Sequence, residues 1–137
     1  LVLGFGRIGK LLSYRLAAMG ACVTAAARRP ESRAWAKAYG YQALNIESLE
    51  GNLAELDVVV NTVPAPVFGE ECLRELKPDC LCVDVASVQG IDLAAAEKLG
   101  LPNTWARALP GKLVPHTAGR IIRDTVYTII KEQGVIL

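Results

Sequence analysis

Short apolar runs recur along the chain, and longer segments with helical periodicity separate them. The runs are continuous rather than alternating, as in 57–63 (DVVVNTV) and 80–86 (CLCVDVA). Continuous apolar strands are expected where helices cover both faces of a parallel sheet, and strands that alternate with helices are typical of doubly wound folds. The pattern therefore predicts an α/β fold, a Rossmann-type doubly wound parallel sheet with helices on both faces. Strands are expected at 1–3, 22–27, 57–63, 80–85 and 104–109.

Boundary residues mark the ends of several helices. Gly20, Gly40 and Gly100 each follow a helical segment, at the position where a left-handed residue closes a helix. Pro30 suits a first helical turn, and Asp92 suits an N-cap.

The last helix is expected at about 117–133, with Thr117 as its N-cap. Its apolar residues are spaced as one buried stripe, so we expect this helix to pack on the sheet as its last layer. The stripe consists of Ile121, Ile122, Val126, Ile129 and Ile130.

A G-x-G-x-x-G motif lies between the first apolar run and the first helix. Gly4 permits a tight turn, Gly6 lets a pyrophosphate approach the backbone, and Gly9 allows close packing of the helix. Free N–H groups at the helix start would face the anion. The alternative is three turn glycines without a ligand. The residues predicted to bind the cofactor here are Gly4, Phe5, Gly6, Arg7, Ile8 and Gly9.

The choice of dinucleotide depends on the end of the second strand, where an acidic residue would bind the ribose hydroxyl of NAD. Arg28 and Arg29 occupy that place, and a guanidinium can bind a 2′-phosphate through two hydrogen bonds. The sequence favours NADP over NAD as cofactor. Alternatively, one or both arginines are simply solvated.

Ligands of open α/β sheets bind beyond the carboxyl ends of the strands. The predicted strands at 57–63 and 80–85 end in polar residues at this edge of the sheet. One of them, Asp84, has either a structural or capping role or a place beside the nicotinamide, and the sequence leaves this open. The residues expected to border the cofactor are Asn61, Thr62, Val63, Pro64 and Ser87.

Composition narrows the class of ligand. The 137 residues carry a formal net charge of +1, which is unlike a nucleic-acid-binding protein, so a small-molecule partner is favoured. No apolar run is long enough to span a membrane. The four cysteines lack paired metal-site spacing, so no metal is expected. Cys80 and Cys82 would share one face of a strand as small apolar residues, which fits a reducing cytoplasm.

The chain is one domain in length, and we predict that residues 1–137 form a dinucleotide-binding domain. It opens inside an apolar run, without a polar lead-in. We therefore expect a fragment that lacks the start of its first strand and an N-terminal domain.

Four segments, 4–12, 58–68, 83–92 and especially 108–122 (ALPGKLVPHTAGRII), resemble the cofactor-binding domain of the family formed by the A subunits of dipicolinate synthase. That family is similar in fold to the D-2-hydroxyacid dehydrogenases. The resemblance implies an NAD(P)-linked oxidation of a dihydro- or hydroxytetrahydrodipicolinate, a dicarboxylate, to dipicolinate for bacterial spores. It also implies a flavoprotein-like second subunit, the B subunit of dipicolinate synthase, and analogy suggests a homodimer. The chain departs from the family's pattern at 88–90, where VQG replaces PGG.

His116 is the only histidine, and 115–119 (PHTAG) resembles the segment that carries the catalytic histidine of D-2-hydroxyacid dehydrogenases. An imidazole exchanges protons near neutral pH, so His116 is the candidate catalytic residue. The alternative is a structural role where a strand meets a helix. Flanking basic residues that could attract a dicarboxylate, or simply be solvated, are Arg107, Lys112, Arg120 and Arg123.

Two other functions stay open. A D-2-hydroxyacid dehydrogenase-like reductase is disfavoured, because Ser87 or Val88 replaces the arginine that holds the substrate carboxylate in that family. The second is a noncatalytic module that senses a dinucleotide.

Overall fold

The computed structural model describes residues 1–134. The chain divides into two compact units, Leu1–Arg107 and Ala108–Leu137.

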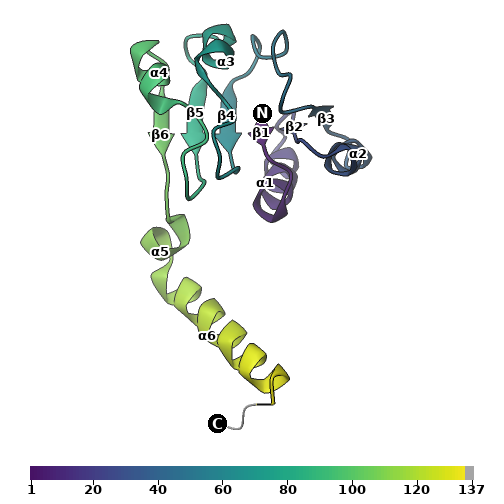
Figure 1. The fold of residues 1–137 in the computed structure, drawn as a ribbon, viewed down its shortest axis with the longest axis vertical. Coiled ribbons are helices and arrows are strands. Elements are labelled where there is room, and N and C mark those ends of the chain that lie inside the picture. Colours follow the sequence, from purple (N-terminus) through teal and green to yellow (C-terminus); the bar gives the residue numbers. More distant parts are fainter. Residues whose placement is uncertain (135–137) are drawn as a thin grey trace. The chain divides into compact units, whose positions relative to one another are not determined.

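The first unit is a parallel sheet connected by helices. Its strands have the spatial order β3-β2-β1-β4-β5-β6, and every neighbouring pair is parallel (Figure 1). This is the strand order of the dinucleotide-binding fold, so the predicted fold class is confirmed. The elements are β1 (Val2–Leu3), α1 (Arg7–Ala18), β2 (Thr24–Ala26), α2 (Pro30–Ala38), β3 (Gln42–Leu44), β4 (Val58–Asn61), α3 (Glu70–Glu75), β5 (Leu81–Asp84), α4 (Leu93–Lys98) and β6 (Asn103–Trp105).

Two strands differ from the prediction. Strand β3 was not expected, because its three residues are exposed or half-buried and give no apolar run. Strand β6 ends at Trp105 rather than at 109. Ala108 has a positive φ of 59°, and Pro110 lies in the first turn of a new helix. Neither conformation continues a strand, so the chain leaves the sheet four residues earlier than expected.

The predicted helix boundaries are confirmed in this unit. Gly20, Gly40 and Gly100 all have positive φ, and Pro30 is the first residue of α2. Asp92 is the N-cap of α4, where its Oδ1 accepts a hydrogen bond of 2.9 Å from the Ala95 N–H. These boundaries depend on local backbone geometry, which the residue types themselves determine.

The main core lies between the strands and the segment that carries α3 and α4. Phe68, Leu73 and Leu3 are among its fully buried side chains. Cys80 and Cys82 are both fully buried, as predicted from their shared face. Burial raises the pKa of the Cys80 thiol, and it raises the pKa of Cys82 to about 12.

The second unit consists of α5 (Leu109–Leu113) and α6 (Pro115–Glu132). Helix α6 begins at Pro115, whose fixed φ suits a first turn, so the prediction of Thr117 as N-cap is wrong.

The apolar stripe on α6 was predicted to be buried. That prediction is also wrong, because no described residue of α6 is buried and Ile122 is 64% exposed. Within residues 1–134, no helix combines the length and the apolar character needed to cross a membrane.

The reactivity of the four cysteine thiols tests which of them lie in the core. Cys22 is exposed, whereas Cys72, Cys80 and Cys82 are buried, and desolvation raises the pKa of each buried thiol. Because the thiolate is the reactive form, we expect a disulfide reagent such as Ellman's reagent to modify one thiol rapidly in the native protein and all four in guanidinium chloride. Cys22→Ser should abolish the rapid phase. A second rapid thiol in the native wild-type protein would contradict this core.

Candidate dinucleotide site

The glycine loop between β1 and α1 is compact enough to require glycine at two of its three positions. Gly4 has φ +93°, and a Cβ there would lie 2.6 Å from the Thr62 Oγ1 and 2.8 Å from the Val63 Cγ2. A Cβ on Gly9 would lie 2.0 Å from the carbonyl oxygen of Gly4. The tight turn and the close packing of the helix are therefore confirmed.

Gly6 differs from the other two glycines, because a Cβ there would meet nothing within 4 Å. The space beside it is open. The first hydrogen bond into the helix runs from the Lys10 N–H to the Gly6 carbonyl (2.9 Å), so the N–H groups before Lys10 lack a partner within the helix. Arg7 and Ile8 are exposed beside them. This arrangement suits the backbone binding of an anion.

Phe5 was predicted among the cofactor-binding residues, but its side chain is only 4% exposed. Its ring packs edge-on against Tyr39 and Tyr41, with centroid distances of 6.3 Å in both pairs. Only the backbone of Phe5 is therefore placed to face a ligand.

The end of β4 packs against the glycine loop. The Thr62 hydroxyl donates a hydrogen bond of 2.8 Å to the Leu3 carbonyl, and the Thr62 N–H donates to the same oxygen at 2.9 Å. The side chain of Asn61 both donates to and accepts from the backbone of Val63 at 2.9 Å. Pro64 follows, exposed. Thr62 and Val63 thus hold the strand ends in position directly beside the glycine loop.

Asp84, the last residue of β5, is fully buried, and donors surround its carboxylate. Both oxygens accept from the Asn61 side-chain amide at 3.0 Å. The backbone N–H of Ala86 donates to Oδ1 at 2.9 Å, and those of Gly90 and Ile91 donate to Oδ2 at 2.7 and 3.0 Å. These bonds resolve the open role of Asp84 in favour of a structural one.

The loop that Asp84 organises contains a third close approach. A Cβ on Gly90 would lie 2.4 Å from the Asn61 Nδ2 and 2.8 Å from the Val63 carbonyl oxygen. Glycine is therefore required at the third position of the VQG segment, although Val88 and Gln89 replace the other two residues of the family pattern. Ser87 is exposed in this loop.

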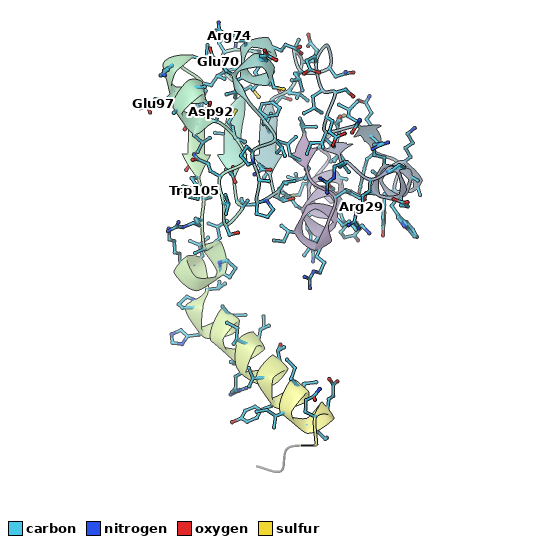
Figure 2. All side chains as sticks on the ribbon, in the orientation of Figure 1. Arg29, Glu70, Arg74, Asp92, Glu97 and Trp105 are labelled. Atoms are coloured by element: carbon cyan, nitrogen blue, oxygen red, sulfur yellow. The ribbon has the colours of Figure 1, made fainter. Side chains whose placement is uncertain are left out.

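Trp105 was not identified from the sequence. Its indole Nε1–H donates a hydrogen bond of 3.0 Å to the Ala86 carbonyl, which connects the end of β6 to the Asp84 loop. Trp105 appears at the end of β6 in Figure 2. A tryptophan at a strand end gives no local signal, because its partner lies 19 residues away in the sequence.

The end of β2 carries the predicted arginines. Arg28 and Arg29 are exposed, and Arg29 is the N-cap of α2. A third arginine, Arg33, donates from Nη1 to the carbonyls of Ala27 (3.0 Å) and Arg28. Arg33 thus holds the backbone of this turn, while the guanidinium groups of Arg28 and Arg29 carry no ion pair within residues 1–134.

A cavity of about 1240 Å³ opens in the first unit between the segment after β3, the segment after β4 and α3. Of the predicted site residues, only Arg28 lines it. Five carboxylates and two arginines line it, so the lining is largely acidic. One of the carboxylates, Glu70, pairs with Arg74, and both residues are labelled in Figure 2. We therefore assign no phosphate to this cavity. Its acidic residues are Glu47, Glu50, Glu70, Glu71 and Asp92.

His116 lies in the first turn of α6, in the second unit, and is exposed. It follows a connection between two helices, so its expected position between a strand and a helix is wrong. Its imidazole makes no hydrogen bond to another residue in 1–134, and its catalytic role stays a prediction. Arg120 and Lys112 are also exposed, whereas Arg123 pairs with Asp124 at 2.7 Å.

Across residues 1–134, no three His, Cys, Asp or Glu side chains are grouped closely enough to hold a metal ion.

Comparison with known proteins places these features in a family. Residues 1–99 match the D-isomer specific 2-hydroxyacid dehydrogenase, NAD binding domain. The chain is 32% identical over 132 residues to the A subunit of dipicolinate synthase from Bacillus subtilis (strain 168), a match that covers 96% of this chain and 44% of the relative.

Two solved structures are also similar to this chain. The A subunit of dipicolinate synthase from Bacillus halodurans is 35% identical with a TM-score of 0.89, covering 94% of this chain and 45% of that one. The corresponding chain of the Bacillus subtilis synthase has a TM-score of 0.91 at 32% identity, over 96% of this chain and 44% of that one. The resemblance seen in the sequence is confirmed, and the chain spans less than half the length of these relatives.

Gly9 is crowded and Gly6 is not, so replacement by alanine should affect stability differently at the two positions. Gly9→Ala should reduce the free energy of unfolding by about 3 kcal/mol or more, because its Cβ overlaps a backbone oxygen that cannot move alone. Gly6→Ala should reduce it by less than about 1 kcal/mol, because the space beside Gly6 is open and its φ is negative. Urea denaturation followed by circular dichroism measures both. Equal losses in the two variants would contradict this loop geometry.

Proposed function

Because the chain belongs to the family of D-isomer specific 2-hydroxyacid dehydrogenase NAD-binding domains, we propose that it binds a nicotinamide dinucleotide at the glycine loop and serves an oxidoreductase. The observation that carries this proposal is the position of the loop. It joins β1 to α1 at the point where the sheet order passes from β1 to β4. In sheets of this order, dinucleotides bind across that crevice.

The residues present suit the pyrophosphate of such a cofactor. The open side of Gly6 and the free N–H groups at the start of α1 provide a place for the anion. Thr62, Val63, Pro64 and Ser87 follow β4 and β5, and in this proposal they border the other half of the cofactor. When bound, the dinucleotide would accept or supply a hydride, which no side chain of the chain can do.

We further propose that the cofactor is NADP. The turn after β2 holds no acidic residue, and Arg33 fixes its backbone so that the exposed guanidinium groups of Arg28 and Arg29 can approach a ribose 2′-phosphate. NAD would lack the phosphate that these two cations can bind.

For the reaction, we propose the formation of dipicolinate, the product in the name of the relatives that match nearly the whole chain. Loss of water from hydroxytetrahydrodipicolinate gives dihydrodipicolinate. Transfer of one hydride to NADP⁺, with release of one proton, then gives the aromatic dicarboxylate. His116 is the proposed proton acceptor. The proposal includes an N-terminal domain that supplies further substrate contacts.

We also propose the partners and the cellular compartment of the reaction. A flavoprotein-like second subunit, the B subunit of dipicolinate synthase, would act with this chain, and the chain would form a homodimer. Three buried free thiols suit a reducing compartment, so we propose the cytoplasm of a spore-forming bacterium.

Cofactor preference can be tested by titration of the intrinsic tryptophan fluorescence with NADPH and NADH. Arg28→Met combined with Arg29→Met should weaken NADPH binding by about 10- to 100-fold, since charge-assisted hydrogen bonds to the phosphate are lost, and should leave NADH binding unchanged. Lys37→Met is the matched control and should change neither, because Lys37 is an exposed cation in the last turn of α2, the helix that follows the two arginines. NADPH that binds no more tightly than NADH to the wild-type protein, and an unaltered double variant, would refute the NADP proposal.

The reaction itself is tested with the whole protein and its flavoprotein-like partner. Given enzymatically generated hydroxytetrahydrodipicolinate and NADP⁺, we expect equal amounts of NADPH and dipicolinate, measured by absorbance, and both should depend on this chain. His116→Gln should lower turnover and change its pH dependence. A protein that binds NADPH but forms no dipicolinate, and that instead reduces 2-ketoacids, would favour the hydroxyacid dehydrogenase alternative. Binding without any turnover would favour the sensing module.

A further inference from the structure

Arg107 lies at the end of β6, in the part of the first unit that continues from the Asp84 loop. The N–H of Ala106 donates a hydrogen bond of 2.7 Å to the Asp84 carbonyl, which fixes where the chain leaves the sheet. Arg107 is the next residue and is exposed. It is therefore anchored by its neighbour to the same residue that organises the loop after β5.

The guanidinium of Arg107 lies over an aromatic ring, which restricts its movement. It lies 4.9 Å from the ring centroid of Trp105, within the range of a cation-π contact. The ring is itself fixed, because its Nε1–H donates to the Ala86 carbonyl. A guanidinium that lies over a ring uses none of its N–H donors in that contact, so they stay available to a ligand.

The donors of Arg107 are not used inside the described chain. No carboxylate in residues 1–134 lies within ion-pair distance of it, and it makes no hydrogen bond to another residue there. Arg74 and Arg123, by contrast, are paired with carboxylates, and Arg33 is bonded to backbone carbonyls. Arg107 thus combines a fixed position with free donors, the two properties that an anion-binding side chain requires.

The position of Arg107 along the sheet indicates which anion it would bind. The pyrophosphate and the ribose phosphate would lie at the glycine loop and at the end of β2, in the half of the sheet formed by β1, β2 and β3. Arg107 follows β6, at the opposite edge, beside the loop after β5. Figure 2 shows Trp105 and Arg29 well apart, each where its strand has ended. A hydride passes directly between the nicotinamide and the substrate, so the substrate must lie at the nicotinamide half of the crevice.

We propose that Arg107, which lies over the ring of Trp105, binds a carboxylate of the substrate and contributes to selection of a dicarboxylate. The inference rests on the proposed function, because it assumes that a nicotinamide dinucleotide occupies the crevice. Arg107 takes no part in hydride or proton transfer. Its role is to bind and orient the acid through charge-assisted hydrogen bonds.

The test uses the whole protein with NADPH bound and titrates it with pyridine-2,6-dicarboxylate, the proposed product. Arg107→Met should raise the Kd of this dicarboxylate, and the KM of the substrate, by about 10- to 100-fold. The affinity for NADPH should stay within about twofold, and kcat should change much less than KM. Arg107→Lys should retain part of the dicarboxylate affinity, because it keeps the charge but loses the planar fork.

Arg15→Met is the matched control. Arg15 is also exposed, and it lies 6.0 Å from the ring of Tyr14, but it belongs to the last turn of α1, near the edge where the strands begin. It should leave dicarboxylate and NADPH binding unchanged.

The outcomes separate the two proposals. Wild-type protein that binds neither NADPH nor NADH would overturn both. If NADPH binds and Arg107→Met keeps the wild-type Kd and KM for the dicarboxylates, this inference alone is wrong. It is also wrong if Arg107→Met weakens NADPH but not NADH, because the anion would then be the ribose phosphate. Wild-type protein that binds NADPH but no pyridine dicarboxylate would refute the inference and the proposed reaction together.

Discussion

A buried carboxylate that must be surrounded by donors determines the carboxyl edge of this sheet. Asp84 is fully buried, and an ionised carboxylate without hydrogen bonds would be strongly destabilising there. The chain supplies those donors by turning the loop after β5 back over the strand end, so that Ala86, Gly90 and Ile91 direct N–H groups at it. The Asn61 amide from β4 provides the remaining contact, which joins two neighbouring strand ends. Asn61 also holds the backbone of Val63, and Val63 with Thr62 occupies the space that a side chain at Gly4 would need. The loop after β5 also presents the Ala86 carbonyl to Trp105 at the end of β6. The contacts of Asp84 and its loop therefore connect the glycine loop to the far edge of the sheet.

The parts of this structure that could be predicted from the sequence are those fixed by local geometry. The turn at Gly4, the close packing at Gly9 and the cap at Asp92 follow from residue types within a few positions of each other. The doubly wound fold class followed from the alternation of strand and helix. Strand β3 escaped prediction because a short, partly exposed edge strand carries no apolar run.

Contacts between distant residues could not be predicted. The donors to Asp84 include an amide 23 positions away, and Trp105 and Ala86 are 19 apart, so the sequence left the role of Asp84 open and gave no role to Trp105. The stripe on α6 was correctly identified as amphipathic, but its burial depends on what surrounds the helix rather than on its own pattern.

The arginines of the first unit show why position alone is a weak guide to function. Arg28, Arg29 and Arg107 follow strands at the carboxyl edge, and Arg33 lies in α2. From position, the sequence assigned a phosphate to Arg28 and Arg29, left Arg107 open and gave no role to Arg33. The surroundings of each side chain in the structure distinguish them further. Arg33 uses its Nη1 donor on backbone carbonyls and therefore supports the turn rather than a ligand. Within residues 1–134, the guanidinium groups of Arg28 and Arg29 carry no ion pair and lie over no aromatic ring, which suits a phosphate that itself brings strong charge. Arg107 likewise carries no ion pair there and is held by a fixed ring, so its loss of side-chain entropy on binding is smaller. A carboxylate carries one charge where a phosphate monoester carries up to two, so it benefits more from a donor that is already in place.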